Sequence, residues 1–389
     1  MTMLIHILML STLAYLAWGV LYQLAYALLG GLYRVPSWPP AQHKGRIAVF
    51  IPAYREDAVI VQTARAALGQ HYPPDKYEVI VIADSLRADT LAALRKLPIR
   101  VVEVHFPKST KAKALNRALE VLADTSFDIA VILDADNEMQ PDFLARINAA
   151  FARGVRVLQG RRAAKNADTP MAILDGLSED ANNHILCKGH SVLGLSARLA
   201  GSGMAFDYAL FQEIMPQVDA IGGFDKELEL RLTRRGERIF YDHGAEILDE
   251  KVRQGAHFSR QRSRWIAAQF HYARRFVPLA FVRLCTKGQL DHFNKAVQML
   301  LPPRLLTPGI LALGALLLTV LGYYPLAMAW AIVCGLNIST FLLALPAYTW
   351  QSPYRDALLR VPLAFIHALR SLLGITKANK EFIHTPHGK

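Results

Sequence analysis

The decapeptide DIAVILDADN, residues 128–137, joins an apolar run to two carboxylates that lie one residue apart, Asp134 and Asp136. An apolar run rich in Ala, Val and Ile is typical of a buried parallel strand. Because side chains alternate along a strand, both aspartates leave its end on the same side. Ligands of open α/β sheets bind beyond the carboxyl ends of the strands, and two carboxylates there suit Mg²⁺ or Mn²⁺ carrying a diphosphate. A strand followed by a polar Asp-Asn turn is the alternative interpretation.

Strands and helices alternate on both sides of this decapeptide. Upstream we predict strands at 47–51, 77–83 and 99–104, and helices at 59–68, 90–96 and 111–123. Downstream we predict a strand at 155–160, a helix at 171–189, a glycine-marked turn at 201–206 before a strand, a helix at 228–235 and short strands at 238–241 and 245–248. The alternation favours a parallel doubly wound sheet, in which right-handed crossovers place the acidic strand ends on one edge. We therefore predict an α/β domain over residues 46–256.

The composition is apolar and basic. The 389 residues are 52% hydrophobic and carry a formal net charge of +12, with a mean hydropathy of +0.20. Such a charge suits nucleic acid, an anionic membrane surface or an anionic substrate. The sequence carries no nucleic-acid-binding motif, so we predict no nucleic-acid partner. The three cysteines are widely spaced, which excludes a disulfide framework and fits a reducing, cytosol-facing domain.

The N-terminal segment is long enough to cross a membrane. Residues 3–33 contain no Asp, Glu, Lys or Arg, and a spanning helix needs about 20 apolar residues. No basic residue precedes the run, which favours an anchor helix over residues 1–33 rather than a cleaved signal peptide. Basic residues follow at Arg34, Lys44 and Arg46, within and just after a proline-containing linker at 34–45. By the positive-inside tendency, the next domain is cytoplasmic, at the inner or plasma membrane.

The C-terminal third combines interfacial and apolar segments. Residues 257–300 mix arginine with aromatic residues, which is typical of helices in the membrane interface. Within 301–350, two apolar runs at about 305–322 and 325–349 predict two transmembrane helices. For 351–389 we predict an interfacial helix and a basic cytosolic tail. A further span at 356–375 is the alternative, although it would place Arg360 inside the apolar slab.

Six short motifs, in this order, carry a resemblance to a known family. They are Ile51-Pro52-Ala53-Tyr54, Asp84, KAKALN at 111–116, Asp134-Ala135-Asp136, Gly223-Phe224-Asp225 and QRSRW at 261–265. The chain resembles membrane-bound family-2 glycosyltransferases, the group that includes cellulose, chitin and hyaluronan synthases. The resemblance implies a GT-A-like fold, that of nucleotide-diphospho-sugar transferases. It also implies inverting transfer from a UDP-sugar, of the glucose or N-acetylglucosamine type, to a growing β-linked polysaccharide.

The resemblance assigns the nucleotide to residues beyond the first two strands. It implies that Tyr54, Glu56 and Asp84 hold uracil and ribose, and a carboxylate can accept hydrogen bonds from both. A helix N-cap is the alternative for Asp84. Lys111 matches the family's nucleotide-side lysine. Lys113 stands where glycine is more usual, and we expect it on a solvated helix face.

The resemblance also assigns a metal and a general base. It implies Mg²⁺ or Mn²⁺ at Asp134 and Asp136, with Asp136 the stronger ligand, and such an ion would neutralise charge on the departing UDP. Asp225 matches the base that takes the proton of the acceptor hydroxyl. Phe224 stands where the family usually has a glutamate, which could change the pKa of the base or the acceptor pocket. Glu227 is a reserve carboxylate, with ordinary helix N-terminal charge as its alternative role.

The QRSRW segment provides the last implied contacts. Gln261, Arg262 and Arg264 would bind the nucleotide sugar, and the guanidinium of Arg264, which the motif requires, can engage a diphosphate bidentately during catalysis. Trp265 would stack on a sugar in the catalytic and acceptor site. An interfacial helix with tryptophan at the headgroups is the alternative.

Acceptor and partners are less closely specified. Gly201, Ser202 and Gly203 would line the acceptor site, with a structural turn as the competing account. The motif around Trp265 favours processive synthesis by resemblance. Because the few predicted spans leave less material for a secretion channel, transfer of one sugar to a lipid is an alternative, and Phe224 leaves open a non-catalytic nucleotide-sugar-binding subunit. We expect a lipid bilayer as partner, and a homo-oligomer or partner subunits are compatible with these motifs.

Overall fold

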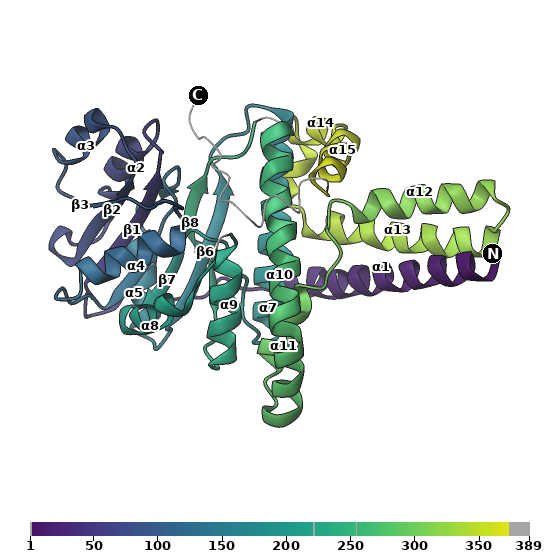
Figure 1. Ribbon diagram of the computed structural model, residues 1–389, viewed down its shortest axis with the longest axis horizontal. Coiled ribbons are helices and arrows are strands. Elements are labelled where there is room, and N and C mark those ends of the chain that lie inside the picture. The colour runs from purple at the N-terminus through teal and green to yellow at the C-terminus, as the bar shows by residue number, and fades with distance from the viewer. Residues whose placement is uncertain (1, 221, 254, 373–389) are drawn as a thin grey trace.

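The computed structural model describes residues 2–220, 222–253 and 255–372, without the side chains of 2–5, 255–262, 264, 371 and 372. An α/β part occupies one end of the molecule, and a bundle of apolar helices projects from the other (Figure 1). Residues 34–45 connect the first apolar helix to the α/β part without helix or strand.

The α/β part is built on one eight-stranded mixed sheet with the order β3-β2-β1-β4-β7-β6-β8-β5. The strands are β1 (Ile47–Tyr54), β2 (Tyr77–Asp84), β3 (Arg100–Val104), β4 (Ile129–Ile132), β5 (Glu138–Met139), β6 (Val157–Ala164), β7 (Met204–Asp207) and β8 (Phe240–Asp249). Strands β1 to β4 are parallel, as predicted. The prediction of a wholly parallel sheet is wrong in its second half, because β7 runs antiparallel to β4 and β6, and β5 antiparallel to β8.

The reversal at β7 has a local cause. The turn before β7 returns the chain at the edge where β4 ends, with Met204 beside Ile132 and the Gly203 N–H donating to the Ile132 carbonyl (2.9 Å). The two short strands predicted at 238–241 and 245–248 are one strand, β8, whose pairing with β6 is interrupted by a bulge between Gly160 and Arg161.

Helices cover both faces of the sheet. They are α2 (Ile60–Ala67), α3 (Ala88–Leu94), α4 (Lys111–Val121), α5 (Phe143–Phe151), α6 (Pro170–Asn182), α7 (His190–Val192), α8 (Tyr208–Ile214) and α9 (Phe224–Arg234). Alternation along β1 sends Phe50 into one core with α4, α8 and α9, and Ile51 into the other with α2 and α5. The predicted helix at 171–189 is confirmed as α6 followed by a π-helical segment, Asn183–Gly189.

The register of the parallel strands places the acidic residues on one edge. Tyr54 is the neighbour of Asp84 at the ends of β1 and β2. Phe50 pairs with Ile132, so Asp134 follows β4 directly at the same edge. The residues after β1 and β2, Arg55 and Ser85, have left-handed φ values of 55° and 58°. Such values are uncommon outside glycine and cluster at functional sites.

Three apolar helices form the projecting bundle: α1 (Thr2–Gly30), α12 (Thr307–Val320) and α13 (Tyr324–Ala344). Among the described residues, His6–Gly30 and Tyr324–Ala344 are long and apolar enough to cross a membrane. The predicted span at about 305–322 is wrong in length. Helix α12 has 14 residues, which corresponds to about 21 Å, whereas the hydrocarbon core is about 30 Å thick.

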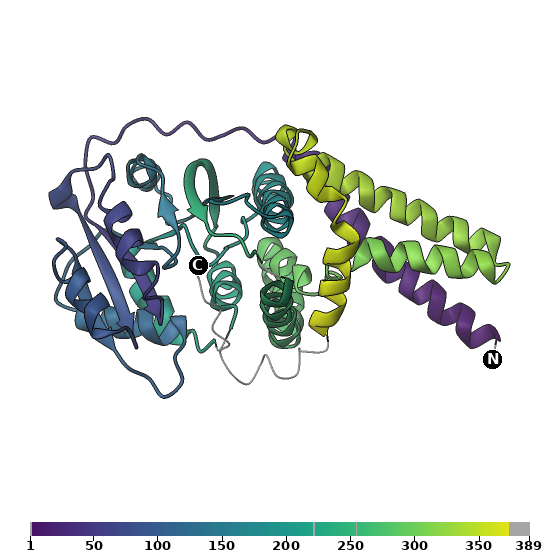
Figure 2. The same cartoon turned by 90° about the horizontal axis from the view of Figure 1, so that it is seen from above.

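Four helices lie where the bundle meets the α/β part: α10 (Gly255–Lys287), α11 (Leu290–Gln298), α14 (Tyr354–Leu358) and α15 (Val361–Leu372). Helices α10 and α15 run across the direction of the bundle (Figures 1 and 2). One face of α10 packs Tyr272 and Phe276 into a core, while Phe270 and Phe281 are exposed. The described part of 356–375 does not form one helix of spanning length. Helix α14 ends before α15 begins, and α15 has 12 residues, whereas a spanning helix needs about 20.

Candidate active site

A cavity of about 480 Å³ extends from the carboxyl edge of the sheet to the base of the helix bundle. Its walls come from β1, β2, α4 and α9 at the sheet end. At the bundle end they come from α1, α10, α15 and the loop between α11 and α12. Most of the residues that the sequence singled out line it, namely Tyr54, Glu56, Asp84, Lys111, Asp134, Asp136, Gly201, Asp225 and Trp265. The fold therefore brings together segments that are more than 200 residues apart.

The sheet end of the cavity presents a fixed carboxylate. Asp84 is 2% exposed, and Ser109 Oγ and Ser85 Oγ donate to its two oxygens at 2.5 and 2.9 Å. Asp84 does not cap a helix, because the N-cap of α3 is Arg87. The helix-cap alternative is therefore excluded, and the two serines hold the carboxylate at the cavity wall. Lys113 is exposed, as predicted.

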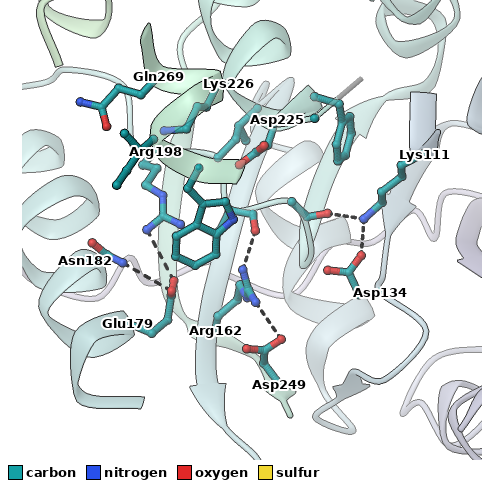
Figure 3. Close-up of a pocket in the computed structure, with 18 of the residues that line it drawn as sticks. Lys111, Asp134, Arg162, Glu179, Asn182, Arg198, Asp225, Lys226, Asp249 and Gln269 are labelled. Atoms are coloured by element: carbon teal, nitrogen blue, oxygen red, sulfur yellow. Dashed lines mark hydrogen bonds and ion pairs between the residues drawn. The ribbon is translucent and has the colours of Figure 1, made fainter. Parts of the chain in front are cut away.

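Lys111 connects the sheet end to the middle of the cavity. Its Nζ donates to Asp134 Oδ1 and to the carbonyl oxygen of Gly201 (2.7 Å). It also lies 5.0 Å from the centre of the Phe224 ring, over the ring face. Figure 3 shows Lys111 and Asp134 together on one side of the cavity. Phe224, which stands where the resemblance predicts an acid, thus lies beneath the ammonium group of Lys111.

A hydrogen-bond network holds the second aspartate. Ser202 Oγ accepts from the Asp134 N–H (2.9 Å) and donates to the amide oxygen of Asn137 (2.8 Å). The amide nitrogen of Asn137 then donates to Asp136 (2.9 Å) and to Asp249 (3.0 Å). Asn137 and Ser202 are fully buried. The network therefore fixes the direction of Asp136 at the strand end.

The donor set fits a divalent cation that arrives with a diphosphate. Among the described residues, no three His, Cys, Asp or Glu side chains form a cluster that could hold a metal alone. Mg²⁺ is nevertheless commonly held by one or two carboxylates together with substrate phosphates. Asp134 and Asp136 both line the cavity, and Asn137 orients Asp136. Because Lys111 occupies one oxygen of Asp134, Asp136 is the better-suited ligand.

Asp225 lies in the first turn of α9. Gly223 precedes the helix with a φ of 64°, which glycine adopts without strain. A Cβ at Gly223 would come within 2.9 Å of the Ala268 side chain, so this position also allows α9 to approach α10 closely. Asp225 and the adjacent Lys226 line the cavity, and burial lowers the pKa of Lys226. In Figure 3, Asp225 lies between the Lys111 side of the cavity and the Arg198 side.

Glu227, the predicted reserve carboxylate, does not serve this cavity. It is 1% exposed, and Arg231 Nη2 and Arg275 Nη1 donate to its Oε1 at 2.7 and 3.2 Å. Its ion pairs tie α9 to α10, which is a structural role. The carboxylate that follows Asp225 toward the cavity is instead Glu229, one turn further along α9.

Sequence reasoning missed an ionic network in the wall opposite Lys111. Asp249 pairs with Arg162 (2.7 Å), as Figure 3 shows. Asp249 also pairs with Lys251 (2.5 Å), and Arg162 donates to the Ala200 carbonyl (2.6 Å). Burial alone would raise the pKa of Asp249, but the two cations outweigh it and hold the pKa well below its ordinary value. The signal was the pair of arginines, Arg161 and Arg162, directly after the strand predicted at 155–160; β6 extends through both of them, and buried arginines must be neutralised.

A second missed pair lies nearer the bundle. Glu179 lies 3.7 Å from Arg198 and accepts from the Asn182 amide (3.4 Å) (Figure 3). Burial opposes ionisation of Glu179, yet Arg198 and Arg162 lower its pKa to about 2. Both carboxylates of this wall are therefore charged at neutral pH.

Some predicted contacts lie elsewhere. Ser202 is fully buried and hydrogen-bonded within the network, and Gly203 packs against Ile247. The prediction that these two residues contact the acceptor is therefore corrected in favour of a structural turn, and Gly201 alone of the three lines the cavity.

The QRSRW motif is described in part. The backbone of this segment belongs to α10, and Trp265 lines the cavity. The side chains of Gln261, Arg262 and Arg264 lie outside the described residues, so their roles stay predictions.

The class of protein follows from comparison with known families. A model described as glycosyltransferase-like family 2 matches residues 43–268, which is more than half of the chain. The chain belongs to this family, and the predicted glycosyltransferase activity is thereby confirmed at the level of the family. The sugar donor of this class is a nucleotide sugar.

Two curated proteins are similar to this chain over most of its length. A beta-monoglucosyldiacylglycerol synthase of Synechocystis sp. is 28% identical over 318 residues, which cover 75% of this chain and 63% of the relative. The probable glycosyltransferase YdaM of Bacillus subtilis is 22% identical over 289 residues, covering 68% and 67%. The chain thus spans about two thirds of the length of these curated relatives.

A solved structure shares the fold over nearly the whole chain. A mannosyltransferase of Pyrobaculum calidifontis, in complex with GDP-Man and Mn²⁺, has a TM-score of 0.58 at 18% identity, covering 95% of this chain and 98% of that one. The predicted GT-A-like α/β fold is confirmed, with a mixed sheet in place of the predicted parallel one. Membership of the processive cellulose and chitin synthase group stays a prediction.

Proposed function

We propose that this chain transfers one hexose, with inversion, from a UDP-sugar to a lipid acceptor at a membrane surface. One observation carries the proposal: a single cavity is lined by Asp84 at the nucleotide edge, by Asp225 in the middle, and by Leu306 and Ala368 at the helix bundle. A lipid held among the apolar helices would reach the reacting centre without leaving the protein.

The bundle end of the cavity suits an acyl or isoprenoid chain. Its lining includes Leu301, Pro302, Leu305 and Leu306, all from the loop between α11 and α12. Apolar chains are stabilised in such a wall by about 25 cal/mol for each Å² removed from water. Polar side chains at this end are Gln23, Gln269, Gln298 and Arg304. The Nε of Arg304 donates to Gln23 of α1 (2.9 Å). This pair lies where the polar head of a lipid would pass into the cavity.

The same bundle argues against export of a polysaccharide through the described helices. A polar polymer needs a polar passage, because unpaired hydroxyl groups are costly in an apolar medium. The centre of the bundle is filled instead by Leu16, Val20, Leu311 and Leu318, packed around Trp330. The relative from Synechocystis is named for a diacylglycerol product, which supports a lipid acceptor here. Processive synthesis of a polysaccharide is therefore the less favoured candidate.

In this proposal the chain's own residues perform four tasks. Asp225 takes the proton of the acceptor hydroxyl as that oxygen attacks the anomeric carbon from the side opposite the leaving diphosphate. Lys111 and Asp134 lie on the donor side, and Trp265 offers a ring face to the sugar. A divalent cation held by Asp136, with Asp134, would supply a positive charge to the leaving diphosphate.

The arrangement of helices supports a membrane location. If α1 and α13 cross the bilayer, then α10 and α15 lie along its surface, because they run across the bundle direction (Figures 1 and 2). The exposed Phe270 and Phe281 would then enter the interface. The basic residues Arg34, Lys44 and Arg46 favour a cytoplasmic α/β domain.

A transfer assay tests the proposal. The full chain would be incorporated into vesicles containing diacylglycerol and supplied with Mn²⁺ and labelled UDP-glucose or UDP-N-acetylglucosamine in turn. We expect one labelled glycolipid, separable by thin-layer chromatography. A labelled polymer ladder without glycolipid would overturn the acceptor assignment, and retention of all label in the nucleotide would overturn the activity.

A further inference from the structure

Helix α9 presents a second carboxylate to the cavity, Glu229, one turn after Asp225. Residues four apart lie on the same face of a helix, and both line the cavity. Glu229 Oε2 accepts from the Leu199 N–H at 2.7 Å, while Oε1 lies 3.6 Å from Lys295 Nζ. Glu229 therefore connects the helix of the proposed base to two other elements.

Lys295 is an unusual partner for this carboxylate. Its side chain is 0% exposed, and within the described residues its Nζ has no hydrogen-bond partner, so Glu229 is its close counter-charge. Burying two charges commonly costs more than their attraction returns. Stability alone therefore does not account for an ammonium group placed beneath Glu229. The adjacent residue Asn294 accepts a hydrogen bond from Tyr22 of α1 (2.7 Å), so the helix that carries Lys295 is also fastened to the first apolar helix.

Leu199 begins the segment 199–203, which we call the acceptor loop because its residue Gly201 lines the cavity, while Ser202 and Gly203 only shape the turn. The middle of the loop is held by several hydrogen bonds: Arg162 donates to the Ala200 carbonyl, Lys111 donates to the Gly201 carbonyl, and Ser202 accepts from the Asp134 N–H. Gln159 also accepts from the Ala200 N–H and donates to the Ser202 carbonyl. At the start of the loop, Glu229 of α9 accepts the hydrogen bond of the Leu199 N–H. The loop is thus held between Asp134 and α9, the helix that carries Asp225.

We propose that Glu229, held by Lys295, is a positioning residue that fixes the acceptor loop opposite Asp225 and so sets the affinity for the acceptor hydroxyl. This inference rests on the proposed function, because it assigns the loop to the acceptor. Glu229 touches no reacting atom in this account. It acts through Leu199, and the Tyr22–Asn294 contact couples the same device to α1.

Two changes test the role of Glu229. The double variant Glu229→Met with Lys295→Met removes both charges together, so that neither is left buried alone, and it also removes the acceptor of the Leu199 N–H. Glu229→Asp keeps the charge but shortens the side chain by one methylene, so it cannot serve both Leu199 and Lys295. We expect each to raise the acceptor KM at least about tenfold, which corresponds to about 1.4 kcal/mol, while the Kd for UDP with Mn²⁺ and the rate of donor hydrolysis by water stay within about twofold of wild type.

The matched control is another acid–base pair that involves α9. Glu213→Gln with Arg235→Met removes the pair between Glu213 and Arg235, whose side chains are 60% and 32% exposed, and should leave both KM values unchanged. A folded Glu229 variant with wild-type acceptor KM would overturn the inference, and so would an equal rise of the donor and acceptor KM values. If the double variant does not fold, Glu229→Asp decides by the same criteria. If wild type forms no glycolipid, the proposed function fails; if wild type and the Glu229 variants form it equally well, the proposed function stands and this inference fails.

Discussion

Replacing Asp225 by asparagine removes a proton acceptor while it keeps the size and polarity of the side chain. A positioned general base contributes a factor of about 10²–10⁴ to the rate. The surroundings place Asp225 in the upper part of this range, because the two described carboxylates that follow it on α9, Glu227 and Glu229, are both engaged elsewhere. Glu229 is engaged by Leu199 and Lys295, and Glu227 is locked by two arginines outside the cavity. We expect kcat to fall by at least about 10³-fold, which is about 4 kcal/mol in the barrier.

The assay separates this loss from a loss of binding. Transfer to diacylglycerol would be followed by labelled glycolipid, and binding of UDP in the presence of Mn²⁺ by titration calorimetry. Asp225 lies on α9, whereas the nucleotide edge is formed by the ends of β1 and β2 and by Lys111. Asp225→Asn should therefore keep the wild-type Kd for UDP while transfer is lost.

Glu227→Gln is the companion variant. It removes a carboxylate two residues away on the same helix and should lower the melting temperature, because Arg231 and Arg275 lose their common partner, without a comparable loss of kcat. If Asp225→Asn retains more than about a tenth of the wild-type kcat, the assignment of the base is refuted. If Glu227→Gln loses turnover while Asp225→Asn does not, the base is Glu227 and α9 must adopt a different orientation during turnover.

Three further predictions concern the metal, the ionic wall and pH. Asp136→Asn should abolish the gain in UDP affinity that Mn²⁺ gives the wild-type protein. Asp134→Asn should reduce this gain less, because Lys111 already occupies one oxygen of Asp134. Calorimetric titration of UDP with and without Mn²⁺ distinguishes the two variants. Arg162→Leu should lower the free energy of unfolding by about 3 kcal/mol, which is the lower end for a broken buried ion pair. The loss is at the lower end because Lys251 still neutralises Asp249. Thermal unfolding in detergent measures the loss, and an unchanged melting temperature would contradict a stabilising role of the ionic wall. Burial, with Arg283 and Arg234 nearby, lowers the pKa of His292 to about 4. The contribution of the neutral imidazole to stability is therefore present above its unfolded pKa of about 6.5 and is lost as pH falls toward 4. By pH 5 the loss is about 2 kcal/mol. His292→Asn should remove this part of the fall in unfolding free energy between pH 7.5 and 5, and an unaltered pH dependence would show that His292 is not responsible.

The part of the cavity at the strand ends could be predicted because its signals are local. An apolar run that ends in Asp134 and Asp136, and a second that ends in Asp84, each specify a strand and the edge at which it stops. Parallel pairing then brings these ends together without further information. Helix α4 was predictable for the same reason, since its apolar spacing begins at Lys111 directly after Thr110, whose hydroxyl accepts from the Lys113 N–H and caps the helix.

The ionic wall opposite Lys111 was less predictable because it depends on tertiary contacts. Arg162, Glu179 and Asp249 each resemble an ordinary polar residue in the sequence, and they become a wall only when β6, α6 and β8 come together. The predicted length of the helix at about 305–322 was wrong for a local reason. The apolar run continues past Val320, where α12 ends, and Gly322, with a φ of 79°, allows the chain to turn. Apolar composition reports burial in protein or lipid, and it does not report where a helix ends.

The antiparallel course of β7 is the feature that makes one active site out of these parts. A parallel β7 would leave the turn 201–203 at the opposite edge of the sheet, far from Asp134. Because β7 starts at the carboxyl edge, the Gly201 carbonyl reaches Lys111 and Ser202 reaches the Asp134 backbone. The same reversal presents Leu199 to Glu229 on α9. The direction of one four-residue strand therefore brings the 201–203 turn to the same edge of the sheet as Lys111 and Asp134.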